Sequence, residues 1–342
     1  MRISHEESTR TTPFPLRPLA GNWGCTDRVE RGAPIVVSAI DMPALADWCR
    51  VHLGAAPARV LFETGHLSRV VGLTLTDGRD VVVKARPPAE RIRACFEVHR
   101  HLWSAGFACP QPLAGPVPLG TLTATAEAYV PGGALPSPRT AQPYADALAA
   151  LVSLAPPVDA LSTLEPPPAW TWWDHDQPGI WPLPDDRDGD LNANAGPDWL
   201  DEVGTGVRDR LRRFGQAPVV GHVDWEAQNL CFTDGWRLHA VHDWDSIAAR
   251  PEATLAGLAA AVYTATGAPA TEATIDQTEE FLTAYAHARG RHWTRDELHA
   301  CWAAGLWVRA FNAKKESMND PAAPILDRLR TEAPERLRRA GM

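Results

Sequence analysis

The residues best suited to chemistry lie in the segment GHVDWEAQN, which spans positions 221–229. His222 stands two residues before Asp224, and Asn229 follows that aspartate by five residues. A carboxylate can take the proton from an attacking hydroxyl, and amide or carboxylate oxygens can bind a metal ion. An isolated His-x-Asp occurs often by chance, so the inference depends on the whole set.

A second acidic cluster, VHDWD at positions 241–245, follows after a short interval. That interval contains Asp234-Gly235, a pair typical of a tight hairpin turn. Such a hairpin folds Asp243 back beside Asn229, so that these oxygens and that of Asp224 converge on one loop-rich surface. Mg²⁺ prefers oxygen ligands of this kind, with phosphate oxygens and water completing its octahedron.

Lysine is rare in this chain. Of 33 basic residues only Lys84, Lys314 and Lys315 are lysines. Lys84 follows the run Val81–Val83, which reads as a strand that begins after a hairpin turn at Asp77-Gly78. Because arginine serves almost everywhere else, a lysine at the end of this strand marks a position where a compact ammonium is useful.

These motifs resemble the aminoglycoside phosphotransferase and choline kinase family, small-molecule relatives of the protein kinases. The family carries His-x-Asp-x-x-x-x-Asn, a short hairpin and an Ile-Asp-Trp-like segment, and GHVDWEAQN and HDWD match these in order and spacing. The resemblance implies that Asp224 is the catalytic base and that His222 braces its loop. It also implies that Asn229 and Asp243 bind Mg²⁺.

The resemblance extends upstream and implies a nucleotide-binding set. Lys84 takes the place of the phosphate-binding lysine, and Glu97 on the following predicted helix resembles its ion-pair partner, with Glu90 as the alternative. Gly65 and Ser68 resemble the loop over the phosphates, where backbone N–H groups and a hydroxyl can reach phosphate oxygens.

The implied fold is of the α+β class, two-lobed and protein-kinase-like. The pattern along the chain agrees, because strands and one helix precede a mainly helical remainder. We predict an irregular extension over 1–37, a β-rich nucleotide-binding N-lobe over 38–131, and a mainly helical C-lobe over 132–342 with the catalytic and acceptor sites. Near the end of the N-lobe, Ala128 and Val130 resemble the hinge whose backbone groups meet adenine.

An insertion rich in Trp and Asp, residues 165–202, holds ten acidic residues and one basic residue, Arg187. Aromatic faces stack on sugar rings and hold cations, and carboxylates attract ammonium groups. The segment favours an amino sugar, an aminoglycoside or another cationic alcohol, while neutral sugars, choline-like amino alcohols and macrolides stay open. The alternative is a solvated acidic loop whose tryptophans cover the helical lobe. The candidate acceptor contacts are Trp172, Trp173, Asp174, Asp176 and Asp245.

The predicted activity is phosphorylation of a small-molecule hydroxyl with ATP or GTP and Mg²⁺. One rival is a metal-dependent hydrolase centred on His222, Asp224, His242 and Asp243, which would leave Lys84 without a role. Another is a catalytically silent nucleotide-binding module. Such a module would normally have lost the base or the metal-binding aspartate.

Composition limits the partners and the compartment. The net charge of −9 makes nucleic acid an unexpected partner, because phosphate binding needs a basic patch. No apolar run approaches ~18 residues, so no membrane association is expected, and the N-terminus lacks a secretory pattern. The six cysteines are scattered without a Cys-x-x-Cys pair, which predicts a reducing cytoplasm. The oligomeric state stays open.

Overall fold

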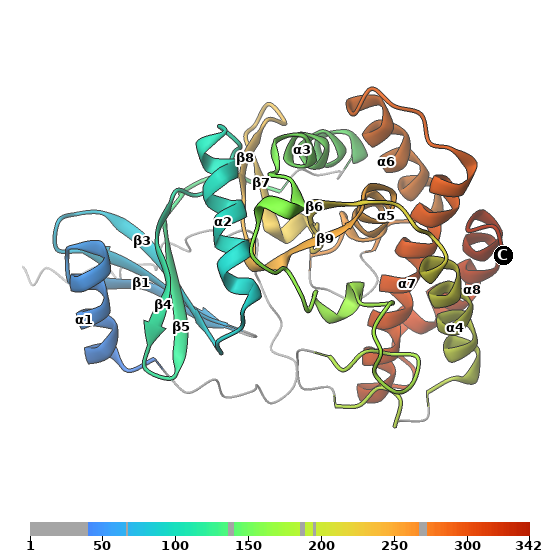
Figure 1. The fold of residues 1–342 in the computed structure, drawn as a ribbon, viewed down its shortest axis with the longest axis horizontal. Coiled ribbons are helices and arrows are strands. Elements are labelled where there is room, and N and C mark those ends of the chain that lie inside the picture. The colour runs from blue at the N-terminus through green and yellow to red at the C-terminus, as the bar shows by residue number, and fades with distance from the viewer. Residues whose placement is uncertain (1–39, 66–67, 136–139, 185–188, 194–195, 267–271) are drawn as a thin grey trace, which may run out of the picture.

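In Figure 1 a β-sheet lies at one end of the described part of the molecule and a set of helices lies at the other. The predicted extension 1–37 lies outside the described residues. The computed structural model describes residues 40–65, 68–135, 140–184, 189–193, 196–266 and 272–342.

The first half is built on a five-stranded antiparallel sheet with the strand order β1-β2-β3-β5-β4. The predicted hairpin at Asp77-Gly78 joins β2 to β3, and Gly78 has the positive φ of 87° that this turn requires. We call this sheet with its helices α1 and α2 the N-lobe. Its elements are α1 (Met42–Leu53), β1 (Pro57–Gly65), β2 (Arg69–Leu75), β3 (Asp80–Arg86), α2 (Arg91–Ser104), β4 (Pro112–Leu119) and β5 (Leu122–Ala128).

Strand β3 separates an apolar face from a charged one. Val81, Val83 and Ala85 are buried and share a core with Leu45 of α1. Side chains alternate along a strand, so Lys84 lies on the opposite face of the sheet, the one that looks toward the rest of the molecule.

Helix α2 belongs to a different core from the sheet. Its buried Cys95, Val98 and Leu102 join the large apolar cluster formed mainly by the C-terminal helices. The sheet and α1 form a separate cluster. Although α2 follows β3 directly in sequence, its packing ties it to the second half of the molecule.

The second half, which we call the C-lobe, is mainly helical. Helix α5 is buried from Ala253 to Val262, and α7 packs against it. The two backbones approach so closely that a Cβ at Gly257 would lie 2.0 Å from the carbonyl oxygen of Cys301. The helices are α3 (Ala141–Leu154), α4 (Asp198–Arg212), α5 (Glu252–Val262), α6 (Ile275–Ala288), α7 (Arg295–Asn319) and α8 (Pro324–Arg339).

Two short antiparallel ladders lie between the sheet and these helices. Strand β6 pairs with β9, and β7 pairs with β8 as the hairpin predicted around Asp234-Gly235. None of the helices in the described ranges is long and apolar enough to cross a membrane. The short elements are η1 (Val158–Ala160), η2 (Ala169–Thr171), β6 (Pro218–His222), η3 (Ala227–Asn229), β7 (Leu230–Phe232), β8 (Leu238–Val241), η4 (Trp244–Ser246) and β9 (Ile247–Pro251).

Candidate active site

His222 ends strand β6 and braces the loop that carries Asp224. Its Nε2–H donates to the carbonyl oxygen of His242 at 3.0 Å, and its Nδ1 accepts from the backbone N–H of Asp224 at 3.3 Å. Burial lowers the pKa of His222, because an imidazolium in this position would lose its hydration. The ring is therefore neutral and fixes the backbone of the loop.

Asn229 orients the carboxylate of Asp224. Its Nδ2 donates both to the carbonyl oxygen and to Oδ2 of Asp224, each at 2.8 Å. The amide nitrogen faces the aspartate, so Oδ1 of Asn229 points to the other side. An amide donor fixes the direction of this half-buried carboxylate without cancelling its charge.

Asp243 is brought to the same place by the β7–β8 hairpin. The N–H of His242 donates to the carbonyl oxygen of Asn229 at 2.9 Å, which joins the end of the hairpin to η3. Asp243 then adopts φ 64° and ψ 50°, a left-handed conformation that is uncommon for a residue with a Cβ. Such an outlier often marks a side chain that must point in one direction.

The charge of Asp243 is kept despite its burial. Burial alone would raise the pKa of this carboxyl, but the positive charges of Lys84 and Arg86 and a hydrogen bond from Ser246 outweigh it. The Ser246 hydroxyl donates to Oδ2 at 3.1 Å. The resulting pKa lies below the ordinary value, so Asp243 is an anion at neutral pH.

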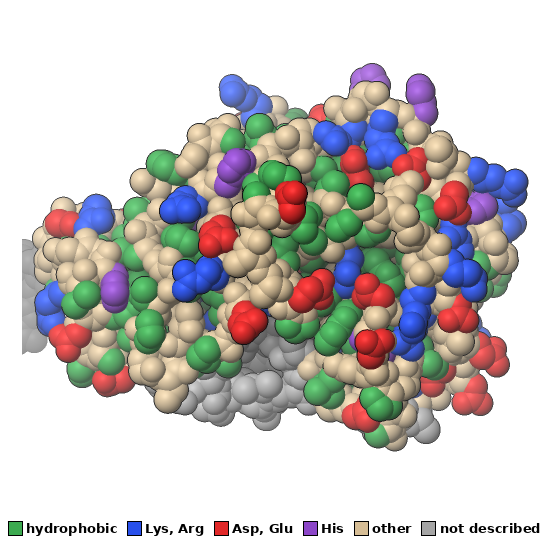
Figure 2. Space-filling view, viewed as in Figure 1, with side chains coloured by type: hydrophobic (Ala, Val, Ile, Leu, Met, Phe, Trp, Pro, Cys, Tyr) green, Lys and Arg blue, Asp and Glu red, His purple; other side chains and the backbone are tan. Residues whose placement is uncertain are grey.

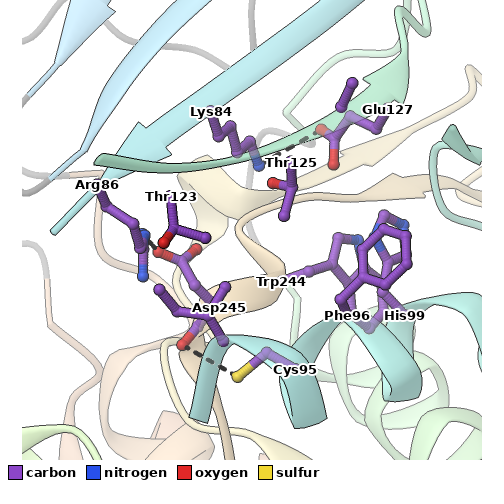
Figure 3. Close-up of a pocket in the computed structure, with 12 residues that line it drawn as sticks. Lys84, Arg86, Cys95, Phe96, His99, Thr123, Thr125, Glu127, Trp244 and Asp245 are labelled. Atoms are coloured by element: carbon purple, nitrogen blue, oxygen red, sulfur yellow. Dashed lines mark hydrogen bonds and ion pairs between the residues drawn. The ribbon is translucent and has the colours of Figure 1, made fainter. Parts of the chain in front are cut away.

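Lys84 projects from β3 toward this cluster, but its ion-pair partner is not the predicted one. Its Nζ lies 3.3 Å from Oε1 of Glu127 on β5, and both side chains are almost fully buried (Figure 3). Glu97 instead accepts from the backbone N–H and the hydroxyl of Ser162, at 3.4 and 3.3 Å. The prediction for Glu97 was wrong, because α2 turns other side chains toward the lysine. Glu90 is exposed at the start of the helix.

Asp245 also lies away from its predicted place among the acceptor contacts. It lines a small pocket beneath β3 and forms an ion pair with Arg86 (Figure 3). Its carbonyl oxygen accepts from Arg91 of α2 at 2.8 Å, and Arg91 also donates to the carbonyl oxygen of Ile247. The segment that follows Asp243 is thus fastened to both β3 and α2.

Two further groups of predicted nucleotide contacts lie at the ends of strands. Gly65 ends β1, and a Cβ there would lie 2.7 Å from the carbonyl oxygen of Ser68, so the turn requires glycine. Positions 66 and 67 of this loop lie outside the described residues. Ala128 ends β5, and its N–H donates to the carbonyl oxygen of Gln111 at 2.8 Å. A base could therefore use its carbonyl oxygen or the backbone of the half-buried Val130.

A family model described as the phosphotransferase enzyme family matches residues 59–301. The chain belongs to this family. A sequence comparison with curated proteins gave no match.

Solved structures extend the likeness of this phosphotransferase to most of its length. The amicoumacin kinase hAmiN, in complex with AMP-PNP, Ca²⁺ and Ami, is 12% identical with a TM-score of 0.61, covering 82% of this chain and 89% of that one. A thermostable mutant of aminoglycoside phosphotransferase APH(4)-Ia is 15% identical, with a TM-score of 0.53 and coverage of 85% and 98%. Spectinomycin phosphotransferase APH(9)-Ia, with ADP and spectinomycin, is 12% identical, with a TM-score of 0.51 and coverage of 88% and 94%. The predicted two-lobed, protein-kinase-like α+β fold is confirmed.

Two of the predicted acceptor contacts in the Trp- and Asp-rich segment of the phosphotransferase, Trp173 and Asp174, have other partners. Trp173 is only 4% exposed and belongs to the C-lobe core, with the guanidinium of Arg250 5.1 Å from its ring centroid. The same Arg250 pairs with Asp174 at 3.1 Å. Trp173 therefore has no face left for a sugar, and Asp174 already has a cationic partner. Trp172 is half-buried and Asp176 is exposed, so these two stay candidates.

The hydrolase alternative finds no support in the site. Within the described ranges, no three His, Cys, Asp or Glu side chains converge to hold a metal ion. Both ring nitrogens of His222 are engaged by backbone groups. The oxygens of Asn229 and Asp243 are a suitable pair for Mg²⁺ only when phosphate oxygens complete the shell.

Sequence reasoning missed Glu127, Arg86 and Arg91. A signal for Glu127 existed in the strand alternation, since Val82 pairs with Glu127 and Lys84 with Thr125 across β3 and β5. That register puts Glu127 and Lys84 on one face, but it depends on a pairing between strands that are not consecutive in the chain.

Proposed function

We propose that this phosphotransferase transfers the γ-phosphoryl group of ATP or GTP to a hydroxyl of a small molecule. The observation that carries the proposal is the Asp224 carboxylate, oriented by Asn229 and adjoining an anionic Asp243 that lies in the field of Lys84. Phosphoryl transfer has a loose transition state, so catalysis needs positioning and charge neutralisation more than covalent chemistry.

Each residue then has one task. Asp224 accepts the proton of the acceptor hydroxyl as its oxygen attacks phosphorus, and His222 holds the loop in place. Lys84 binds phosphate oxygens of the nucleotide. Oδ1 of Asn229 and the carboxylate of Asp243 are the oxygens that would hold Mg²⁺. The bound ion would offset the charge of the phosphates.

The acceptor we propose is an amino sugar, an aminoglycoside or another sugar. The similar structures include proteins named for amicoumacin, aminoglycosides and spectinomycin. The net charge of −9 and the exposed Asp176 favour a cationic ligand. Figure 2 shows acidic and basic side chains interspersed on its visible face, without the continuous basic surface that a nucleic acid would need.

Residues 38–131 would form the nucleotide-binding lobe, and 132–342 the lobe with the catalytic and acceptor sites. The cytoplasmic location stays a prediction from the cysteine pattern.

The test is a screen of the purified protein with Mg²⁺ and either ATP or GTP against sugars, amino sugars, antibiotics and amino alcohols. Nucleotide consumption and the mass gain of one phosphoryl group on the acceptor are measured together. Asp243→Ala serves as the control and should lose Mg²⁺-dependent nucleotide binding in calorimetry. Failure of the unaltered protein to bind either nucleotide would contradict the proposal, and binding without turnover of any acceptor would favour the silent module. Tightly bound zinc, manganese or iron would favour the hydrolase.

A further inference from the structure

The ion pair of Lys84 is contained within the N-lobe sheet. Lys84 on β3 and Glu127 on β5 come from adjacent strands, and their side chains lie on the same face. The Nζ–Oε1 distance is 3.3 Å, with 12% of the lysine side chain and 7% of the glutamate side chain exposed. A buried carboxylate is costly unless a cation compensates it. Burial raises the pKa of Glu127, and the ammonium of Lys84 offsets part of that shift.

Helix α2 faces the same pocket without an acid. The side chains that it contributes to the lining are Ile92, Cys95, Phe96 and His99. His99 is fixed by a 2.8 Å hydrogen bond with the carbonyl oxygen of Pro110 and stacks on Trp244 at 4.6 Å between ring centroids. In Figure 3 the phenylalanine and the histidine stand across the pocket from Lys84 and Glu127. None of these helix residues can hold an ammonium by charge.

Helix α2 instead packs mainly against the C-lobe. Its buried side chains join the C-lobe core, and Arg91 donates to backbone carbonyls just beyond Asp243. An acid on this helix would follow the C-lobe if the two lobes shifted relative to one another. An acid on β5 keeps its distance from Lys84, because both belong to the sheet.

We propose that Glu127 is the positioning residue for Lys84, so that the sheet rather than helix α2 sets where the lysine meets the nucleotide phosphates. This inference rests on the proposed phosphotransfer function. Glu127 would hold the Lys84 ammonium at the back of the pocket and keep it from forming an ion pair with Asp243. The positive charge of Lys84 already lowers the pKa of that nearby carboxyl group. Without Glu127, Lys84 would pair with Asp243 and compete with Mg²⁺ for that carboxylate.

The test compares Glu127→Gln with Glu97→Gln. Both change one carboxylate to an amide of the same shape, but only the first touches Lys84. Binding of Mg·nucleotide is measured by calorimetry without an acceptor, together with the Mg²⁺ concentration at half-saturation and the melting temperature. We expect Glu127→Gln to weaken nucleotide binding by about 10–100-fold, by analogy with the loss seen when the hydrogen-bonding partner of a metal ligand is removed. The Mg²⁺ midpoint should rise as well, while Glu97→Gln should bind as the unaltered protein does.

Glu127→Asp covers the case in which the glutamine variant fails to fold. It keeps the charge but shortens the reach, so it should fold normally and bind nucleotide more weakly than the unaltered protein. Unchanged nucleotide and Mg²⁺ binding in Glu127→Gln, or in Glu127→Asp if only that variant folds, would overturn the inference. An equal loss in Glu97→Gln would overturn it too. If the unaltered protein binds no Mg·nucleotide, the proposed function fails and this inference with it; binding by that protein with no effect at Glu127 refutes the inference alone.

Discussion

Two regions of the molecule carry the same pair of neighbouring residues, an aspartate beside a tryptophan, and use it differently. In the candidate active site two such pairs are Asp224-Trp225 and Asp243-Trp244, and in the Trp- and Asp-rich segment one such pair is Trp173-Asp174. All three tryptophans are buried, at 0%, 4% and 4% exposure in that order. Each anchors the chain and fixes where the adjoining carboxylate stands.

The difference lies in what faces the carboxylate. Asp174 is paired with Arg250, a guanidinium that also packs over Trp173 and donates to the carbonyl oxygen of Thr171. Asp224 is held by the amide of Asn229, and Asp243 by a serine hydroxyl. A carboxylate with a permanent cationic partner stabilises the fold. A neutral hydrogen-bond donor orients a carboxylate and leaves its negative charge available to a ligand.

The largest effect on turnover should come from the oriented carboxylate. Asp224→Asn should fold and bind nucleotide, and should lose phosphotransfer by about 10²–10⁴-fold, because it cannot accept the hydroxyl proton. Asp174→Asn makes the same chemical change beside Trp173 and should keep turnover per folded molecule within about twofold, since no proton passes through it. Steady-state rates of both variants with one acceptor decide the comparison. Near-normal turnover in Asp224→Asn would remove its assignment as the base.

The anchoring tryptophan of the other region should act on stability. Trp173→Ala should lower the free energy of unfolding by about 3–5 kcal/mol, the cost of emptying a large buried aromatic site. Trp172→Ala, at a half-buried position, should cost about 1–2 kcal/mol. Chemical denaturation followed by circular dichroism measures both. If Trp173→Ala kept its stability but raised the acceptor KM, the tryptophan would belong to the acceptor site after all.

Asp245 tests the same contrast, between a carboxylate with a cationic partner and one held by a neutral donor, within the candidate active site. It lies two residues after Asp243 but forms an ion pair with Arg86. Asp245→Asn should cost about 1–2 kcal/mol of stability through the partly buried pair. A double-mutant cycle with Arg86→Gln should show coupling between the two side chains. Turnover per folded molecule should change by no more than about threefold, because Asp245 takes no part in the proposed proton transfer. A loss as large as that of Asp224→Asn would show that a permanent ion pair can also serve catalysis here.

The sequence alone predicted the parts of the site that depend on local signals. The Asp234-Gly235 turn sets the β7–β8 hairpin, and this hairpin brings Asp243 to Asn229. The strand of Lys84 is likewise defined by valine residues and a turn. Spacing within a short segment and hairpin geometry were enough for these, because each contact closes a small loop of chain.

The parts that failed depend on distant partners. Glu97 follows Lys84 on the next helix and was the natural choice, but the rotation of α2 is set by the C-lobe core rather than by its own sequence. Asp174 meets Arg250 across 76 positions, and nothing near Asp174 indicates that pairing. Composition could describe this segment as aromatic and acidic, but it could not tell which tryptophans are buried or which carboxylates are neutralised.

The smallest expected effect is a change in acceptor KM on substituting Asp176. It tests whether the Trp- and Asp-rich segment attracts a cationic acceptor. Asp176 is exposed, whereas Asp174 is partly engaged by Arg250. If the segment attracts a cationic acceptor, Asp176→Asn should raise the acceptor KM by about two- to threefold at low ionic strength, because an exposed charge acts weakly through water. The effect should vanish at about 0.5 M salt, where the screening length falls well below 10 Å. Nucleotide KM should not change, and Asp174→Asn should have a smaller effect because its charge is already offset. An acceptor KM that is indifferent to Asp176→Asn at every salt concentration would leave the segment with a purely structural role, and the acceptor's charge would have to be recognised elsewhere in the C-lobe.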